Sequence, residues 1–177
     1  HLVNPDVFID NHVSNGADYQ YVLTYIQTQH QKLGSDLGNY LKDEMTPKIR
    51  TQLLKKKIES IPYVTVYGAT PEKGFTQMMD LPRYSTGYAS LFHTIGYMPE
   101  THMLKKYEDR VKVTYEFMLE TIAHTDANYL KIKNLRAKNQ LQFKPKSLYT
   151  LQWKIDSTKV EQIDFLGFES GYKKSEI

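Results

Sequence analysis

The feature that most constrains the fold is a set of apolar residues that recur every four positions after Ser35. This period predicts a helix with one apolar face. The apolar positions are Leu37, Leu41, Met45, Ile49 and Leu53. Thr46-Pro47 interrupts the run, and because threonine is a good N-cap and proline suits the first helical position, we expect two helices or one kinked helix.

Short β-like runs lie on both sides of this helical stretch. Val7-Phe8-Ile9 is apolar and precedes the polar string Asp10-Asn11-His12, as expected of a buried strand that delivers polar side chains at its end. Tyr63 to Tyr67 is the clearest strand pattern, and further strands are predicted within 19–26 and 95–100. Strands and helices therefore alternate, which favours an α/β fold.

The remaining segments divide the chain. Gly68 to Gly87 reads as an extended loop, and helices are predicted over 109–123 and from 126 to about 138. The first of these helices carries a stripe formed by Val111, Tyr115, Met118 and Ile122. Two β-like runs, 148–155 and 160–168, follow Pro145, so we expect one α/β unit over 1–145 and the start of a C-terminal β module over 146–177.

Composition excludes several functional classes. The net charge of +3 comes from dispersed Lys and Arg, which is too weak for a dedicated nucleic-acid binder. The absence of cysteine excludes disulfides and thiolate metal sites. No apolar run approaches the ~18 residues of a membrane span. The chain begins at His1 without a secretion signal or methionine, so we expect a processed or excised piece whose compartment stays open.

Local motifs for chemistry are missing, and two strand ends stand out instead. The sequence contains no H-x-x-E, H-E-x-x-H, G-x-S-x-G, G-x-G-x-x-G or P-loop pattern. Polar residues follow apolar runs at 10–16 and 100–102, and ligands bind where strands of α/β sheets end. His12 and Glu100 could converge there, although a hydrogen-bonded structural histidine and a solvated glutamate are the alternatives that spacing alone leaves open.

Three strings resemble a bacterial branch of the zinc carboxypeptidases, the carboxypeptidase A-like metallopeptidases. They span 4–21 (NPDVFIDNHVSNGADYQY), 82–88 (PRYSTGY) and 99–105 (PETHMLK), and they occur in the order of that family. The resemblance covers most of residues 1–125. It implies the C-terminal half of the catalytic domain, with part of a mixed central sheet flanked by helices and truncated on the N-terminal side.

The resemblance also implies roles for two of these residues. In the family, an early H-x-x-E pair and a later histidine in a D-x-H motif hold zinc, and Asp10-Asn11-His12 matches that motif. His12 would be the third ligand, and Asp10 would either support it or cap the turn. Glu100 matches the general base, which takes a proton from zinc-activated water as that water attacks the peptide carbonyl.

The loop before the base would contact the peptide substrate. Tyr84 matches the family's mobile tyrosine and Tyr88 is the substitute. Arg83 would either bind a substrate carboxylate or brace the loop.

The sequence departs from the family at the upstream H-x-x-E and at the substrate-binding Asn-Arg segment, which have no counterpart here. We therefore expect zinc in the full-length protein, but a metal-free and inactive chain on its own. The expected partners are a peptide substrate and the upstream half of the same domain, without nucleic acid or a membrane span. An unpaired sheet edge predicts self-association, and the resemblance suggests export to the periplasm or outside the cell.

Two other functions remain open. Tyrosine-rich loops stack on sugars and peptides, so the chain could be a non-catalytic peptide- or glycan-binding module. It could also be an inactive peptidase homologue that serves as a scaffold.

Overall fold

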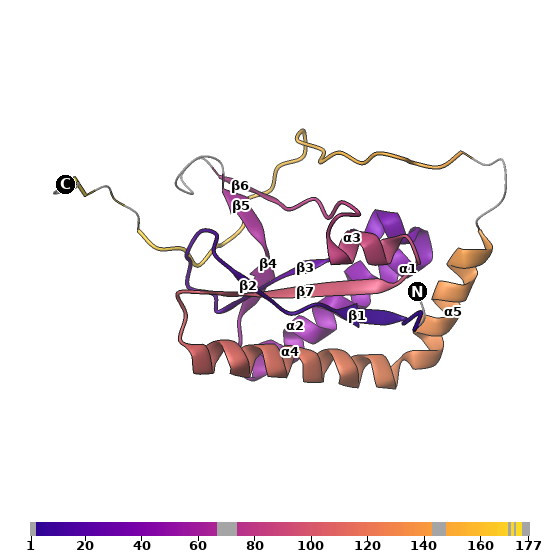
Figure 1. Ribbon diagram of the computed structural model, residues 1–177, viewed down its shortest axis with the longest axis horizontal. Helices are drawn as coiled ribbons and strands as arrows, with labels where there is room; N and C mark the ends of the chain where they lie inside the picture. The colour runs from indigo at the N-terminus through magenta and orange to yellow at the C-terminus, as the bar shows by residue number, and fades with distance from the viewer. Residues whose placement is uncertain (1–2, 67–73, 143–147, 170, 172, 175–177) are drawn as a thin grey trace.

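The protein has an α/β fold, as the sequence predicted. A β-sheet with parallel and antiparallel strands, flanked by helices, forms its body (Figure 1). The computed structural model describes residues 3–66, 74–142, 148–169, 171 and 173–174. The five-stranded sheet has the order β1-β7-β3-β4, and β2 also pairs with β7. Its strands are β1 (Val7–Ile9), β2 (His12–Ser14), β3 (Leu23–Gln27), β4 (Ser60–Pro62) and β7 (Ile95–His102). Only the β3–β7 pair is antiparallel among these described strands.

The predicted apolar helical run is confirmed, and all five of its apolar residues are buried. It comprises α1 (Ser35–Asn39), the π-helical η2 (Tyr40–Met45) and α2 (Thr46–Lys55), and the short 3-10 helix η1 (His30–Leu33) precedes it. The predicted N-cap role of Thr46 is wrong, because its backbone is helical. Its hydroxyl instead bonds Gln27 and Tyr97 in the core. The widened turn of η2 ends two residues before Pro47, which has no amide hydrogen to donate.

The side chains of β7 point alternately into the main core and to the opposite face of the sheet. Ile95 and Tyr97 are fully buried in the main core, where the Tyr97 ring meets Phe117 edge-on. Gly96 lies on the opposite face under α3 (Ser85–Ser90), where an added Cβ would come within 3.2 Å of the Thr86 Cα. Because side chains alternate along a strand, Glu100 shares this α3-facing side.

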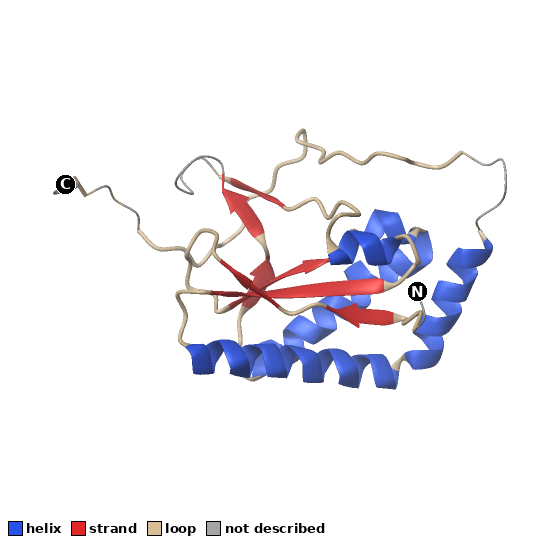
Figure 2. Cartoon of the chain, in the orientation of Figure 1, coloured by secondary structure: helices blue, strands red, loops and turns tan. Residues whose placement is uncertain are grey.

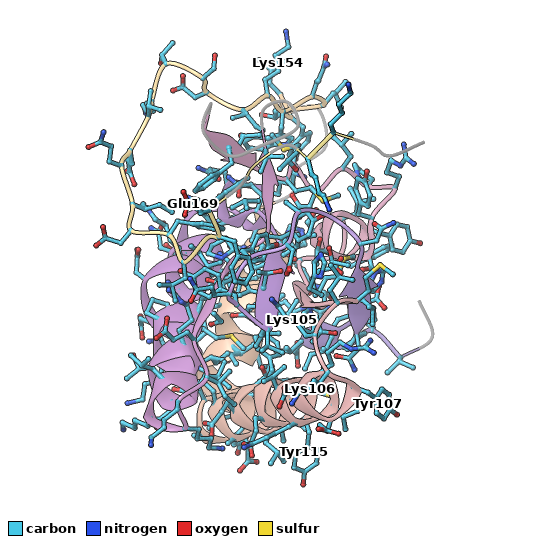
Figure 3. The ribbon with its side chains drawn as sticks, turned by 90° about the vertical axis from the view of Figure 1, so that its left-hand side faces the viewer. Lys105, Lys106, Tyr107, Tyr115, Lys154 and Glu169 are labelled. Atoms are coloured by element: carbon cyan, nitrogen blue, oxygen red, sulfur yellow. The ribbon has the colours of Figure 1, made fainter. Side chains whose placement is uncertain are left out.

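The two long helices are confirmed with somewhat longer bounds, α4 (Tyr107–Ala127) and α5 (Tyr129–Leu141). Figure 2 shows α4 running along the sheet, and α5 turning from the end of α4 to pass one end of the sheet. The face of α4 that enters the core differs from the stripe seen in the sequence. Val113, Phe117 and Thr121 are buried, whereas Val111, Tyr115 and Ile122 are 49%, 55% and 60% exposed. In Figure 3, Tyr107 and Tyr115 point away from the body of the molecule.

Beyond α5 the chain runs as an extended segment. The described residues 148–169 contain no strand, so the two strands predicted there are absent. Leu148, Leu151 and Val160 are exposed there, and a hairpin without a second layer to cover it is marginal in water. The division into an α/β unit and a β module remains a prediction.

A small second sheet follows β4. It pairs β5 (Val64–Val66) with β6 (Phe75–Gln77), so the predicted strand at 63–67 is present as far as residue 66, and Tyr67 lies outside the described residues. The predicted loop over 68–87 contains β6 and the start of α3, and its residues 68–73 also lie outside the described part. In the described part of the chain, we find no helix with the length and apolar character of a membrane span.

Candidate active site

The structure brings His12 and Glu100 together. They occupy directly paired positions of the parallel strands β2 and β7, so their side chains leave the sheet on the same face. The His12 Nδ1 lies 3.8 Å from the Glu100 Oε1. Two residues that are distant in the sequence therefore form one polar pair at the ends of neighbouring strands.

Asp10 orients the His12 ring from the other side. Its Oδ2 lies 2.9 Å from the His12 Nε2. The Asp10 backbone is itself fixed, because its amide donates to the Tyr97 carbonyl in the gap between β1 and β2. An Nε2–H that donates to the Asp10 carboxylate leaves the Nδ1 lone pair free to face Glu100. A carboxylate on the remote ring nitrogen is the usual support of a metal-binding histidine.

Glu100 lies in a setting suited to a proton acceptor. Its side chain is only 11% exposed, whereas that of His12 is 44% exposed. Burial raises the pKa of the Glu100 carboxyl above its usual value, His12 opposes this rise, and the negative charge of Asp10 adds to it. A carboxylate whose pKa is raised toward neutrality is a better general base at physiological pH than an ordinary exposed one.

A buried tyrosine that the sequence interpretation did not single out lies beside the pair. Burial raises the pKa of Tyr19 to about 12, and the nearby Glu100 charge contributes to this rise. Its phenol is therefore protonated at neutral pH and can donate a hydrogen bond. Its place in the string Asp18-Tyr19-Gln20-Tyr21, inside the first motif, was the available signal.

The predicted substrate residues lie on and just before α3. The Arg83 guanidinium stands 5.3 Å from the centroid of the Tyr84 ring, and the Tyr88 ring packs on Phe92 with centroids 5.2 Å apart. These contacts are with each other and with Phe92, rather than with His12 or Glu100. The structure thus unites the first pair of predicted site residues but does not join the loop residues to it.

The residues present fit one part of a zinc site. A catalytic zinc takes three protein ligands and one open position. Within the described ranges, no three His, Asp or Glu side chains are grouped to hold a metal ion. His12, with Asp10 on its remote nitrogen, is suited to be one such ligand, and the described residues do not supply the others.

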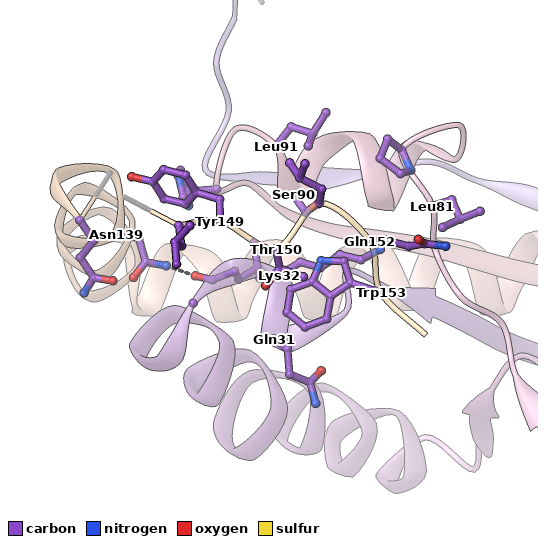
Figure 4. Close-up of a pocket in the computed structure, with 17 residues that line it drawn as sticks. Gln31, Lys32, Leu81, Ser90, Leu91, Asn139, Tyr149, Thr150, Gln152 and Trp153 are labelled. Atoms are coloured by element: carbon purple, nitrogen blue, oxygen red, sulfur yellow. Dashed lines mark hydrogen bonds between the residues drawn. The ribbon is translucent and has the colours of Figure 1, made fainter. Parts of the chain in front are cut away.

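A separate cavity of about 690 Å³ lies where the extended C-terminal segment crosses the body (Figure 4). Its lining includes Tyr149 and Trp153 from that segment and Lys32, Leu91 and Asn139 from the body. Neither His12 nor Glu100 belongs to the lining. Among the described residues, this cavity is therefore a candidate ligand site distinct from the His12–Glu100 pair.

Comparisons of this chain with family models, with curated proteins and with solved structures gave no match. The functional assignment consequently depends on the sequence motifs and on the geometry of the His12–Glu100 pair.

Proposed function

We propose that this chain is the C-terminal half of a zinc-dependent metallocarboxypeptidase domain, a hydrolase of peptide bonds near a C-terminus. The supporting observation is the geometry of three residues. The His12 Nδ1 faces the Glu100 carboxylate, and Asp10 holds the opposite ring nitrogen. A metal ligand and a general base need this closeness, since both must act on one water molecule.

Each side chain has one task in this proposal. His12 would be one of the residues that hold zinc, through Nδ1, and Asp10 would keep the proton on Nε2. Zinc, when bound, supplies Lewis-acid activation of water and of the peptide carbonyl. Glu100 accepts the proton of the attacking water at a carboxylate oxygen and later gives it to the leaving amine. The partial burial of Glu100 keeps competing water away from that oxygen.

The residues just before α3 and on it would bind the peptide substrate. Arg83 is exposed and carries a planar guanidinium that can bind the C-terminal carboxylate of a peptide in a bidentate way. Tyr84, with Tyr88 as its substitute, would close over the peptide. Because the Arg83 guanidinium now lies over the Tyr84 ring, substrate binding would have to separate them. The resemblance further favours an exported protein.

The partner in this proposal is the upstream half of the same domain. β1 and β2 form one edge of the sheet, and the described residues add no further strand there. An unpaired edge offers backbone donors and acceptors to another strand. A segment with an H-x-x-E pair, placed along this edge, would bring its ligands beside His12. In its absence we expect copies of the chain to pair through the same edge.

Zinc stoichiometry tests the proposal. The isolated chain should bind no stoichiometric zinc by elemental analysis, because one imidazole cannot hold the ion tightly. Co-expression with an upstream H-x-x-E segment should bring zinc to about one equivalent and produce carboxypeptidase activity. Stoichiometric zinc in the isolated chain, or none in the assembled protein, would contradict the proposal.

Three variants of the assembled protein sharpen this test. His12→Ala should remove the zinc, and Asp10→Asn should weaken zinc binding about 10–100-fold, as expected for a carboxylate that supports a ligand. His30→Ala, in η1, is the matched control and should leave zinc binding unchanged. Equal effects of His12→Ala and His30→Ala would remove His12 from the metal site.

The cavity at the C-terminal segment supports a second candidate function, a peptide- or glycan-binding module. Tyr149 and Trp153 offer aromatic faces. Among the described residues, the Oδ1 of the buried Asn139 has no hydrogen-bond partner, so it can accept a bond from a ligand hydroxyl or amide.

Trp153 is the single tryptophan of the chain, so fluorescence excited selectively at tryptophan, without exciting the 14 tyrosines, reports on this cavity. Titration with oligosaccharides or short peptides should change the emission if the module binds them. Binding that persists in the double variant His12→Ala, Glu100→Ala and is lost in Asn139→Ala would favour this function. An unchanged emission over the whole series would exclude it for those ligands.

A further inference from the structure

Both ring nitrogens of His102, on β7, are engaged in hydrogen bonds. The side chain is almost fully buried, with 4% exposed. The Leu104 amide donates to Nδ1 at 3.2 Å, and Nε2 lies 2.9 Å from the Gly16 carbonyl oxygen. Because a backbone amide can only donate, Nδ1 must carry its lone pair. Nε2 then carries a proton and donates to Gly16, and the Asp18 Oδ1 lies 3.7 Å from Nδ1, so the orientation of the ring is fixed.

This imidazole connects the two strands that carry the candidate site. His102 lies two residues beyond Glu100 on β7, so both side chains leave the same face of the sheet. Gly16 lies in the loop directly after β2, the strand that begins with His12. The Nε2–Gly16 bond therefore attaches the end of the His12 strand to the Glu100 strand.

The loop at Gly16 is also confined from its other side. A Cβ added at Gly16 would come within 2.7 Å of the Tyr63 hydroxyl, so the loop passes close to the end of that side chain. The Ser14 carbonyl accepts a bond from the Met103 amide at 2.9 Å. Near His12 the attachment is weaker, since the Thr101 hydroxyl meets the His12 carbonyl at 3.4 Å. The His102 side chain that makes the bond to Gly16 is itself buried, whereas Gly16 is exposed.

We propose that His102 is a positioning residue that sets the distance between His12 and Glu100 by anchoring the loop after β2. This inference rests on the proposed function, because the distance matters for catalysis only if these two residues act on one water molecule. His102 itself contacts neither the metal ligand nor the reacting atoms. It acts through the Gly16 carbonyl.

Three substitutions separate anchoring from simple support of the fold. His102→Gln retains an amide that can donate to the Gly16 carbonyl, whereas His102→Asn is too short to reach it and His102→Leu cannot donate. In the isolated chain, hydrogen exchange should become at least about tenfold faster at the Gly16 and Met103 amides in the Asn and Leu variants. The Gln variant should stay within about threefold of the wild type at both amides, and the β3 amides should not change in any variant.

The assembled protein gives the catalytic measurement. His102→Asn and His102→Leu should lower kcat about 10–100-fold with KM changed less than about threefold, and His102→Gln should restore most of kcat. Wild-type exchange at Gly16 in the Leu variant, equal acceleration of the β3 amides, or equal kcat in the Gln and Leu variants would overturn the proposal. An assembly that is inactive with wild-type His102 would instead overturn the proposed function, while the exchange data would still decide whether His102 anchors the loop.

Discussion

Glu100 is a residue whose role works against the stability of the fold. Burial raises the pKa of its carboxyl, so the folded chain binds the proton more tightly than the unfolded chain does. The stabilising contribution of the protonated form is complete below the unfolded pKa, and it is lost as the pH rises through the folded pKa. At neutral pH, therefore, an ionised and partly buried Glu100 destabilises the native state.

Replacing this carboxyl should reveal that cost. Glu100→Gln should raise the melting temperature at pH 7 relative to the wild type, and the gain should shrink as the pH falls toward the ordinary glutamate pKa of 4.5, because wild-type Glu100 takes up its proton over this fall. Thermal unfolding across this pH range measures the effect. Glu59→Gln, an exposed glutamate, is the control and should show no such pH dependence. A constant difference between Glu100→Gln and the wild type at every pH would contradict the assigned shift.

The sequence could indicate His12 and Glu100 but not their detailed arrangement. Both follow or end apolar strands, and that placement is visible as a pattern. The choice of Nδ1 as the nitrogen that faces Glu100 depends on the rotamer of His12 and on Asp10, which no spacing encodes. Although Tyr19 lies inside the first motif, its burial was as hidden as the double attachment of His102, because both depend on how the loop after β2 folds back on β7.

Helix α4 shows why an apolar period does not by itself identify the buried face. Val111, Tyr115 and Ile122 form an apolar stripe, yet Val113 and Phe117 form a second apolar set on another face of the helix. The latter is buried because the Phe117 ring packs on Tyr25 and Tyr97 of the sheet. The existence and approximate bounds of the helix were predictable, but its rotation about its own axis depended on partners far away in the sequence.

Paired substitutions on α4 test this assignment of its faces. Phe117→Ala should lower the free energy of unfolding by about 3–5 kcal/mol, because it leaves a cavity between α4 and the sheet. Tyr115→Ala, two residues earlier on the exposed face, should change it by no more than about 0.5 kcal/mol. Urea unfolding measures both. Similar losses for the two variants would mean that the stripe seen in the sequence is the buried face.

The exposed stripe of α4 also predicts how the isolated chain behaves at high concentration. An uncovered apolar helix face favours association, as does the free edge at β1 and β2. Light scattering over a concentration series should show self-association of the wild type. The double variant Val111→Lys, Ile122→Lys should weaken it at least about tenfold if the stripe takes part.

A control for added charge is available on α5. Leu141→Lys also places a lysine at an exposed apolar position, and it should leave the association unchanged. A wild-type chain that stays strictly monomeric at high concentration would count against both the stripe and the edge as contact surfaces.

At the scale of the whole molecule, the C-terminal segment returns to the loop beside the site. The Phe165 ring lies 5.4 Å from that of Tyr19, 5.5 Å from that of Tyr21 and 4.9 Å from that of Phe75. The backbone amide of Gln20 donates a hydrogen bond to the Leu166 carbonyl at 2.9 Å. The sequence showed only a β-like run here, since contacts between the two ends of the chain leave no local pattern.

Removing the contacts of Phe165 should lower the stability of the folded state. Phe165→Ala should lower the free energy of unfolding by about 1–2 kcal/mol, less than for a fully buried ring, because the side chain is half-buried. Leu151→Ala, at an almost fully exposed position of the same segment, should have no measurable effect. Chemical denaturation compares the two, and equal stabilities of both variants would show that the segment does not hold the body together.

The direct pairing of β2 with β7 has a consequence for how uniform a preparation can be. If the shorter strand slipped by one residue, the His12 imidazole would turn to the opposite side of the sheet and lose Glu100 entirely. No intermediate placement exists, so each molecule either contains the pair or lacks it. The fraction of molecules that contain the His12–Glu100 pair would then equal the fraction in which β2 and β7 folded in the correct register.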